Sequence, residues 1–239
     1  VVATTTLTMY AVAEHKLDLD TPVVHYLPAF ARGKGQKALV TVRDLLLHAS
    51  GLPPDPVPGL WKTTRNRKSG VTRAIENDLD TLPGVRMVYS DINAIALAAI
   101  LEKLYHKRLD RLFAEKVARP LGFSRMLFVP PRAWRDEIAA TEIETFRDSA
   151  ALRGAVHDEN AWWLNGVSGH AGLFSDADDL LRFGEWALAG SLGRTFSGPL
   201  QPPTEFAPWR LRQNQPPGSS RAADSFDIVA TFEPLYRQG

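Results

Sequence analysis

The sequence predicts an α/β protein of the α+β kind, with mostly an all-α lobe and an incomplete α/β lobe beside it. Helix-like patterns recur through the first 190 residues, whereas strand character is confined to residues 141–146 and 226–232. A chain of 239 residues can bury one large core or two small lobes. We therefore expect a core over residues 1–190. Residues 191–239 are expected to form an irregular C-terminal segment with at most one strand of the α/β lobe.

The first predicted helices are marked by their start and stop signals. Residues 1–16 contain neither Gly nor Pro and carry spaced apolar side chains, which predicts the body of a helix that starts upstream. Pro22 predicts a short turn of helix through residue 26. Thr41, followed by Asp44 at the third helical position, predicts a capped helix over residues 42–47. The Pro, Gly and basic residues of segment 53–70 predict an irregular loop.

The later helices differ in the width of their apolar face. Residues 90–105 are apolar almost all round, which predicts a helix buried inside the protein. Shorter helices are predicted over residues 72–78 and 110–118. Ser175 and Asp178 form a possible capping box that opens an amphipathic helix to residue 189. Its predicted core face consists of Ala177, Leu180, Leu181, Ala187 and Leu188.

Composition excludes several classes of function. Lys+Arg 28 against Asp+Glu 27 gives a net charge of +1, so no overall field favours nucleic acid or an anionic membrane. The basic clusters lie in predicted loops and are typical of solvated surface. The chain has no cysteine, which excludes disulfides, thiol nucleophiles and cysteine-based zinc sites. No apolar run is long enough to span a membrane. We expect no partner of the nucleic-acid class, and the oligomeric state stays open.

No cofactor or metal is expected. The residues His157, Asp158, Glu159 and His170 could be read as a metal site, but the chain lacks the H-E-x-x-H motif. The segment Gly166-Val167-Ser168-Gly169-His170 begins like a nucleophile elbow, but a histidine occupies the final glycine position. No β-branched strand leads into this segment. Both interpretations are therefore disfavoured.

The tripeptide Tyr89-Ser90-Asp91 is the best candidate for chemistry. Tyr89 would lie one residue before the cap of a buried helix, where the positive end of the helix dipole favours anions. A neighbouring ammonium could then help the tyrosine, which ordinarily titrates near pH 10, to act as a base. Taken alone, the tripeptide is a weak signal. A core tyrosine followed by an ordinary helix cap is the favoured interpretation.

Several segments in order resemble the serine β-lactamase and penicillin-binding protein family, which includes class C β-lactamases, D-alanyl-D-alanine carboxypeptidases and esterases. The resemblance lies in residues 14–28, in the segment Thr41 to Pro53, and in Tyr89-Ser90-Asp91-Ile92-Asn93, which is similar to the family's second motif, tyrosine-x-asparagine. Further similar segments are 120–122, 156–160 and 169–180. The resemblance spans about residues 1–190.

The resemblance implies acyl transfer by a serine hydrolase on a β-lactam, a D-Ala-D-Ala peptide or an ester. Tyr89 takes the catalytic proton-transfer position. Asp91 occupies the position of a substrate-facing asparagine, although an ionised carboxylate can only accept hydrogen bonds. Asn93 is the alternative source of that amide. His170-Ala171-Gly172 is similar to the family's third motif, Lys/His-Thr-Gly, but is predicted to be a structural turn. His170 is a secondary candidate for substrate binding.

The nucleophile is the main departure from the family pattern. No serine in the chain is followed three residues later by lysine. In the family the Ser-x-x-Lys motif precedes the segment similar to Val1-Val2-Ala3, so we expect it just upstream of Val1 in a longer parent, and the chain alone is expected to be inactive. The alternative is a non-catalytic protein that keeps the fold and binds a ligand or partner. Members of the family are often periplasmic or secreted, and their substrates are small molecules or peptidoglycan peptides.

Overall fold

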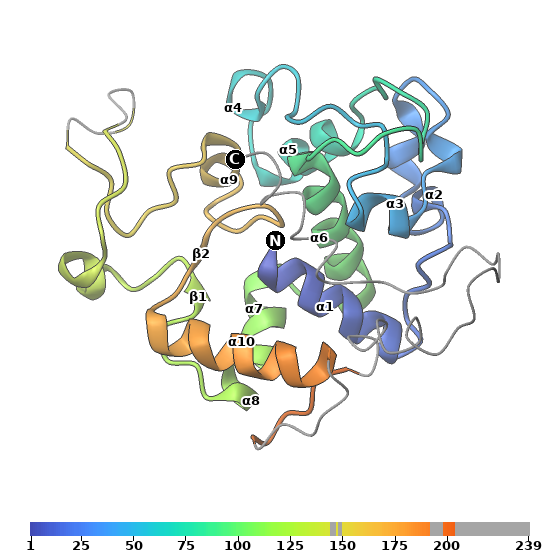
Figure 1. Cartoon of the computed structure of the whole chain (residues 1–239). Helices are drawn as coiled ribbons and strands as arrows, with labels where there is room; N and C mark the ends of the chain where they lie inside the picture. The colour runs from blue at the N-terminus through green and yellow to red at the C-terminus, as the bar shows by residue number, and fades with distance from the viewer. Residues whose placement is uncertain (144–146, 148–149, 192–197, 204–239) are drawn as a thin grey trace.

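The computed structural model describes residues 1–143, 147, 150–191 and 198–203. A helical body is built around helix α6, Asp91–Tyr105, which is flanked by α1, α3, α5 and α7 (Figure 1). Its side chains at Ile92, Ala96, Ile100 and Leu101 are fully buried. The prediction of a helix that is apolar nearly all round and lies inside the protein is confirmed.

The N-terminal half supplies most of the helices around α6. They are α1 Val2–Ala13, α2 Val23–Tyr26, α3 Val42–Leu46, α4 Leu60–Thr63 and α5 Arg67–Ile75, with 3-10 turns η1 Pro28–Arg32 and η2 Lys37–Leu39. The Thr41 cap of α3 is confirmed, because Thr41 and Asp44 each accept a hydrogen bond from the other's backbone N–H. The first helix and the short turn after Pro22 are confirmed as well.

The expected loop over residues 53–70 and the helix start at residue 72 are wrong. Helix α4 lies within that loop, and α5 begins at Arg67. The reason is a second capping box, in which the Asn66 side chain accepts from the Ser69 backbone N–H and the Ser69 hydroxyl accepts from that of Asn66. These polar residues start a helix by satisfying its free N–H groups, although composition alone favours a loop.

After α6 the chain forms a second helical stretch and a small sheet. The stretch comprises α7 Leu109–Phe113, a π-helical turn η3 Ala114–Ala118 and α8 Arg119–Leu121, followed by a left-handed Gly122. Strand β1 Leu127–Phe128 pairs antiparallel with β2 Leu173–Phe174. Between the two strands lie η4 Arg132–Glu137 and α9 Glu159–Trp163. The described part of the chain therefore holds a helical lobe and the rudiment of a sheet.

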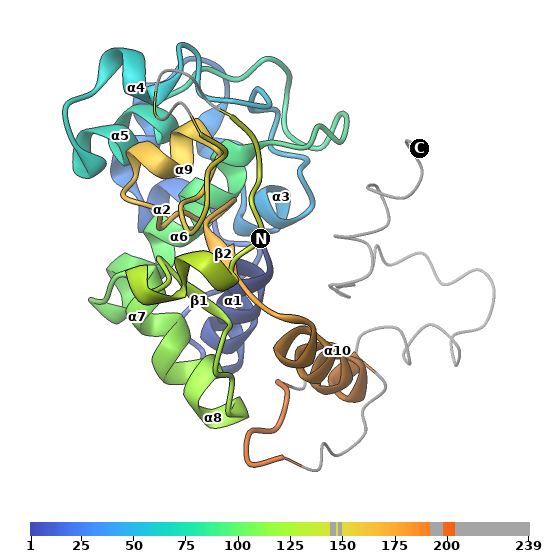
Figure 2. The same ribbon diagram turned by 90° about the vertical axis from the view of Figure 1, so that its left-hand side faces the viewer.

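Helix α10, Ala177–Ser191, lies along the edge of the helical body beside α1 (Figures 1 and 2). Its predicted start is off by one residue, because Asp176, and not Ser175, accepts the hydrogen bond from the Asp179 N–H. Its predicted core face is also wrong. The side chains of Leu180, Leu181 and Leu188 are 53%, 65% and 57% exposed.

Tertiary anchors explain why α10 turns another face inward. Trp186 is fully buried and stacks on Tyr10 of α1 at 6.2 Å between ring centroids. The Asp179 carboxylate accepts the backbone N–H groups of Arg125 and Met126 at 2.6 and 2.8 Å, just before β1. These contacts, which a pattern of leucines cannot reveal, fix the rotation of the helix.

The remaining predicted strands are only partly described. Ile143 makes an isolated antiparallel bridge to Ala151, while residues 144–146 lie outside the described residues. The predicted strand at 226–232 and nearly all of the predicted C-terminal segment 191–239 also lie outside them. No helix within the described ranges is long and apolar enough to cross a membrane.

Candidate active site

A pocket of about 580 Å³ opens between the first turn of α1, the start of α6 and the segment that leads into β2. Its walls include Tyr89, Asp91, Asp158, Ser168 and His170. The sequence-based candidates Tyr89, Asp91 and His170 thus share one cavity, although His170 follows Asp91 at a long distance in the chain. No Lys or Arg side chain lines the pocket among the described residues.

Tyr89 is held at the pocket by hydrogen bonds of the residues that precede and follow it in the chain. The Val88 N–H donates to the His48 carbonyl at 2.9 Å. Ser90 is the N-cap of α6, but its hydroxyl donates to the Pro53 carbonyl at 2.6 Å instead of capping the helix. The Asp91 N–H donates to the carbonyl of Pro54, the next residue, at 2.8 Å. The start of α6 is therefore anchored to the loop after α3, and Tyr89, 44% exposed, faces the cavity from a fixed backbone.

His48 is a site residue whose role the sequence did not reveal. Its ring lies against that of Tyr89, with centroids 4.6 Å apart. Its Nδ1 atom accepts the Ser90 backbone N–H at 3.2 Å, and the Asn93 amide nitrogen lies 3.0 Å from the same atom. Because a backbone N–H can only donate, Nδ1 carries no proton and the ring is neutral. Burial, and then the N-terminal amine, lowers the pKa of His48 to about 4, which agrees with this protonation state.

Asn93 lies behind the pocket wall and not in it. It is fully buried, and its Oδ1 accepts the Ser50 hydroxyl at 2.6 Å while its amide nitrogen faces His48. Both ends of the amide are therefore engaged in supporting the tyrosine loop. In this arrangement Asn93 is buried away from any substrate in the pocket.

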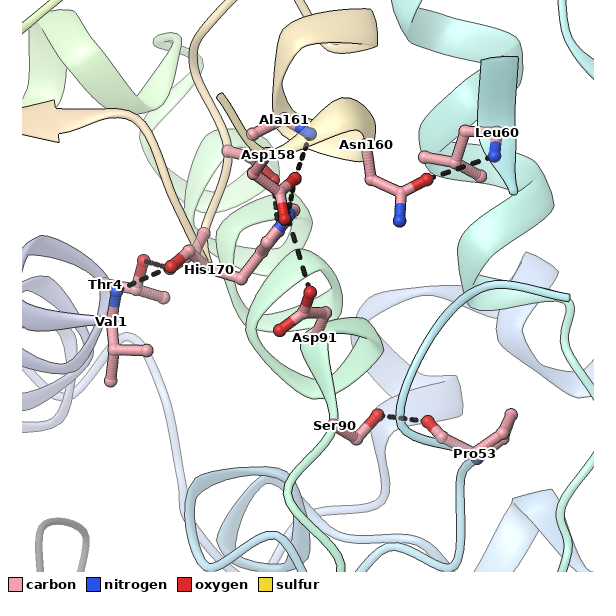
Figure 3. Close-up of polar contacts among 12 residues, drawn as sticks. Val1, Thr4, Pro53, Leu60, Ser90, Asp91, Asp158, Asn160, Ala161 and His170 are labelled. Carbon is pink, nitrogen blue, oxygen red and sulfur yellow. Dashed lines mark hydrogen bonds and ion pairs between the residues drawn. The ribbon is translucent and has the colours of Figure 1, made fainter. Parts of the chain in front are cut away.

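Asp91 and His170 meet at the back of the cavity together with Asp158 (Figure 3). The His170 Nε2 atom lies 2.8 Å from Asp158 Oδ1 and 3.7 Å from Asp91 Oδ2. On the other side of the ring, Nδ1 lies 2.8 Å from the Ser168 hydroxyl. The three carboxylate and imidazole ligand atoms lie within 4.8 Å of one another and could hold a metal ion. As arranged, however, both ring nitrogens already have protein partners.

The charges of this cluster are strongly coupled. Burial raises the pKa of Asp91 to about 6, with His170 acting against the rise and the carboxylates of Asp158 and Asp55 adding to it. Burial also works to raise the pKa of Asp158, but its hydrogen bond from His170 and the charge of that ring outweigh burial and lower it. Burial and the nearby carboxylates raise the pKa of Tyr89. At neutral pH the tyrosine is therefore a neutral phenol in this chain.

The segment before β2 packs directly on the backbone of α6. A Cβ atom added at Gly169 would lie 1.8 Å from the Ala94 carbonyl oxygen, so only glycine fits there. On the other side, the Thr4 hydroxyl of α1 donates to the Gly169 carbonyl at 2.8 Å. His170 is thus carried by a backbone clamped between α1 and α6. The prediction of a structural turn at residues 170–172 holds, since Gly172 has φ +103°, although the turn leads into β2 and also presents His170 to the pocket.

Ser168 completes a Ser168–His170–Asp158 chain of hydrogen bonds, which the disfavoured nucleophile-elbow match did not anticipate. The serine is only 4% exposed. No strand of the described residues leads into it, because α9 and a turn precede it. The buried hydroxyl of Ser168 is therefore placed to hold the ring of His170 in position. Asp158 is the second site residue that the sequence did not single out for catalysis. Its signals were its place in the family-like segment 156–160 and in the disfavoured metal cluster.

Comparisons with known proteins agree with this arrangement of elements. A protein of Salmonella typhimurium that carries the name "Putative D-alanyl-D-alanine carboxypeptidase" is 35% identical over 193 residues. The match covers 71% of this chain but 44% of that relative, so the chain spans less than half of the relative's length.

Two solved structures show the same fold. A D-stereospecific amidohydrolase from Streptomyces is 25% identical with a TM-score of 0.59, covering 80% of this chain and 59% of that one. A β-lactamase/D-alanine carboxypeptidase from Pseudomonas syringae is 20% identical with a TM-score of 0.61, covering 78% and 48%. The expected β-lactamase-like fold, with an incomplete α/β lobe, is confirmed. The β-lactamase family model matches residues 1–227, and the chain belongs to the β-lactamase family.

Proposed function

We propose that this chain is part of a serine hydrolase that transfers acyl groups from a D-Ala-D-Ala peptide, a β-lactam or an ester. Residues 1–190 would form the core of the enzyme. The nucleophile would be the serine of a Ser-x-x-Lys motif just upstream of Val1. The name of the Salmonella relative favours a peptidoglycan peptide among these substrates.

The observation that carries the proposal is the position of Val1. Val1, Val2 and Ala3 line the same pocket as Tyr89 and Asp91, and the Val1 nitrogen lies 3.5 Å from the His170 carbonyl oxygen. A residue joined to that nitrogen would therefore begin at the pocket wall. A helix that continued α1 by one turn upstream would carry Ser and Lys, three residues apart, on one face of the helix.

In this proposal Tyr89 moves protons to and from the nucleophile and the leaving group. The phenol needs a nearby cation to act as a base, because burial and three carboxylates work against the tyrosinate. The motif's lysine would supply this cation. Asp91, two residues after Tyr89 on the same helix end, would accept a hydrogen bond from the lysine ammonium or from an N–H group of the substrate.

The second candidate is a non-catalytic protein that binds a ligand in the pocket, which the absence of Ser-x-x-Lys within the 239 residues favours. The two candidates are separated by the coding sequence upstream of Val1 and by the protein it encodes. If Ser-x-x-Lys is encoded in frame, the longer protein should react with a fluorescent acylating penicillin or ester, and its Ser→Ala variant should not. A longer protein without the motif, or one whose labelling survives that substitution, would reject the catalytic proposal.

A further inference from the structure

The strongest unexplained feature of the site is the environment of His170. Its side chain is only 2% exposed, yet it lies between two carboxylates and a serine hydroxyl. Asp158 and Asp91 both approach the Nε2 side of the ring, at 2.8 and 3.7 Å (Figure 3). Because a carboxylate only accepts hydrogen bonds when ionised, Nε2 must carry the proton that is donated to Asp158.

Asp158 is itself held by contacts that do not involve the pocket. It is the N-cap of α9, where its Oδ1 accepts the Ala161 backbone N–H at 2.6 Å. Asn160 in the first turn of α9 accepts the Leu60 backbone N–H at 3.1 Å, and the Trp163 indole N–H donates to Thr64 at 2.6 Å. Helix α9 is therefore fastened to α4, and the carboxylate of Asp158 has a fixed position from which to orient His170.

We propose that Asp158 and His170 are positioning residues, acting together to fix the place and the charge of Asp91 beside Tyr89. The inference rests on the proposed function only for its catalytic consequence. Asp158 orients the imidazole, and Ser168 contacts its other nitrogen. The ring is thereby held with Nε2 3.7 Å from the Asp91 carboxylate, at the start of α6. An ionised Asp91 can accept hydrogen bonds at both carboxylate oxygens, from an ammonium or from an amide N–H. A protonated Asp91 would carry an O–H donor on one of these oxygens.

The groups that face Asp91 determine in which direction each substitution should shift its pKa. His170 and the N-terminal amine favour the ionised carboxylate, whereas burial, Asp158 and Asp55 favour the protonated one. Tyr89 also faces the same space as a neutral phenol. Loss of the imidazole should therefore raise the pKa of Asp91 further above about 6, and loss of the Asp158 charge should lower it.

The experiment is a carboxyl 13C NMR titration of Asp91 in this chain, assigned with Asp91→Asn. We expect His170→Gln to move the midpoint to higher pH and Asp158→Asn to move it to lower pH, while Asn at position 158 can still cap α9. His157→Gln is the matched control, because His157 lines the same wall beside Asp158 but is not among the groups that set the pKa of Asp91. It should leave the Asp91 midpoint unchanged.

Unchanged midpoints in both variants, or shifts in the same direction, would overturn the proposal. A merely structural role for Asp158 predicts lower stability without opposite shifts. Circular dichroism spectra that match the parent chain should accompany each titration. If a variant fails to fold, Ser168→Ala, which removes the hydroxyl beside Nδ1 but keeps the imidazole and both carboxylates, should still displace the Asp91 midpoint. An unchanged midpoint in that variant would overturn the proposal.

The catalytic consequence is tested separately in the longer protein. There the acidic limb of the pH profile of kcat/KM should move up in His170→Gln and down in Asp158→Asn, in parallel with the NMR midpoints. Opposite NMR shifts in a protein without acyl transfer would reject the proposed function and leave the coupling of Asp158, His170 and Asp91 standing. Acyl transfer whose acidic limb ignores both substitutions would reject the coupling and leave the proposed function standing.

Discussion

The Nδ1 atom of His48 accepts a hydrogen bond from the backbone N–H of Ser90, the residue that joins Tyr89 to helix α6. The same histidine lies with its ring against Tyr89. A neutral, buried imidazole therefore sets both the backbone and the ring position of the candidate catalytic tyrosine. The predictions below test this tyrosine, its carboxylate neighbour and the backbone packing behind them.

Replacement of Tyr89 by Phe in the longer protein should lower acyl transfer by about 100-fold or more, as loss of a general base or acid often does. The measurement is kcat/KM on a D-Ala-D-Ala peptide or an activated ester. Tyr105→Phe is a matched control, because the Tyr105 hydroxyl contacts Glu14 on the exposed surface. A Tyr89→Phe rate equal to that of the control would remove Tyr89 from the mechanism.

This chain, without a Ser-x-x-Lys motif, should form no covalent adduct with a fluorescent penicillin. The measurement is fluorescence of the denatured protein on a gel, with the longer protein as the positive sample. Ser168 is the serine to check, since it lies 2.8 Å from a histidine but is 4% exposed. Labelling that disappears in Ser168→Ala would show that a second serine in the pocket is activated.

Asp91→Asn should stabilise the chain near pH 7 and have little effect near pH 3. Burial raises the pKa of Asp91 in the fold to about 6, above the ordinary value of an aspartate, so the folded state binds this proton more tightly than the unfolded state. Asp91 therefore costs stability progressively as the pH rises from about 4 to 6. The amide should recover up to about 1–3 kcal/mol at pH 7. Urea unfolding at the two pH values measures the difference in free energy of unfolding between the variant and the parent chain. An equal difference at both pH values would contradict the raised pKa of Asp91.

Gly169→Ala should destabilise the fold by about 3 kcal/mol or more, since the added Cβ would meet the Ala94 carbonyl carbon and oxygen of α6 at 2.5 and 1.8 Å. Gly184→Ala is the matched control. It lies within α10 with no atom within 4 Å of the new Cβ, so it should stabilise the chain by about 0.5–1 kcal/mol. Thermal unfolding of both variants measures the contrast. Equal effects of the two substitutions would argue against the close packing of residue 169 on α6.

The sequence was sufficient for features that depend on neighbours in the chain. The cap at Thr41, the buried helix after Ser90 and the turn after Pro22 all follow from local hydrogen bonding and periodicity, and the structure has them. The family resemblance placed Tyr89 and Asp91 together because they share one motif.

Features set by distant contacts could not be predicted in this way. The inward face of α10 is chosen by Trp186 and Asp179, which contact α1 and the approach to β1. His48 and Asp158 enter the site through hydrogen bonds to residues far along the chain. A lone histidine at a helix end, or an aspartate before a helix, carries no local sign of such partners. Helix α4 was missed because its segment has the composition of a loop.

The packing of Gly169 between α1 and α6 affects how the pocket forms during folding. Its wall is made by a stretch of chain that is synthesised long after Tyr89 and Asp91, and that stretch can settle only on a completed turn of α6, between it and α1. Contacts between residues this far apart in the chain form more slowly than local helices, because the intervening chain must be ordered first. A chain in which this segment has not yet docked would hold its tyrosine without the opposite wall, and the pocket would arise only when the segment packs between α1 and α6.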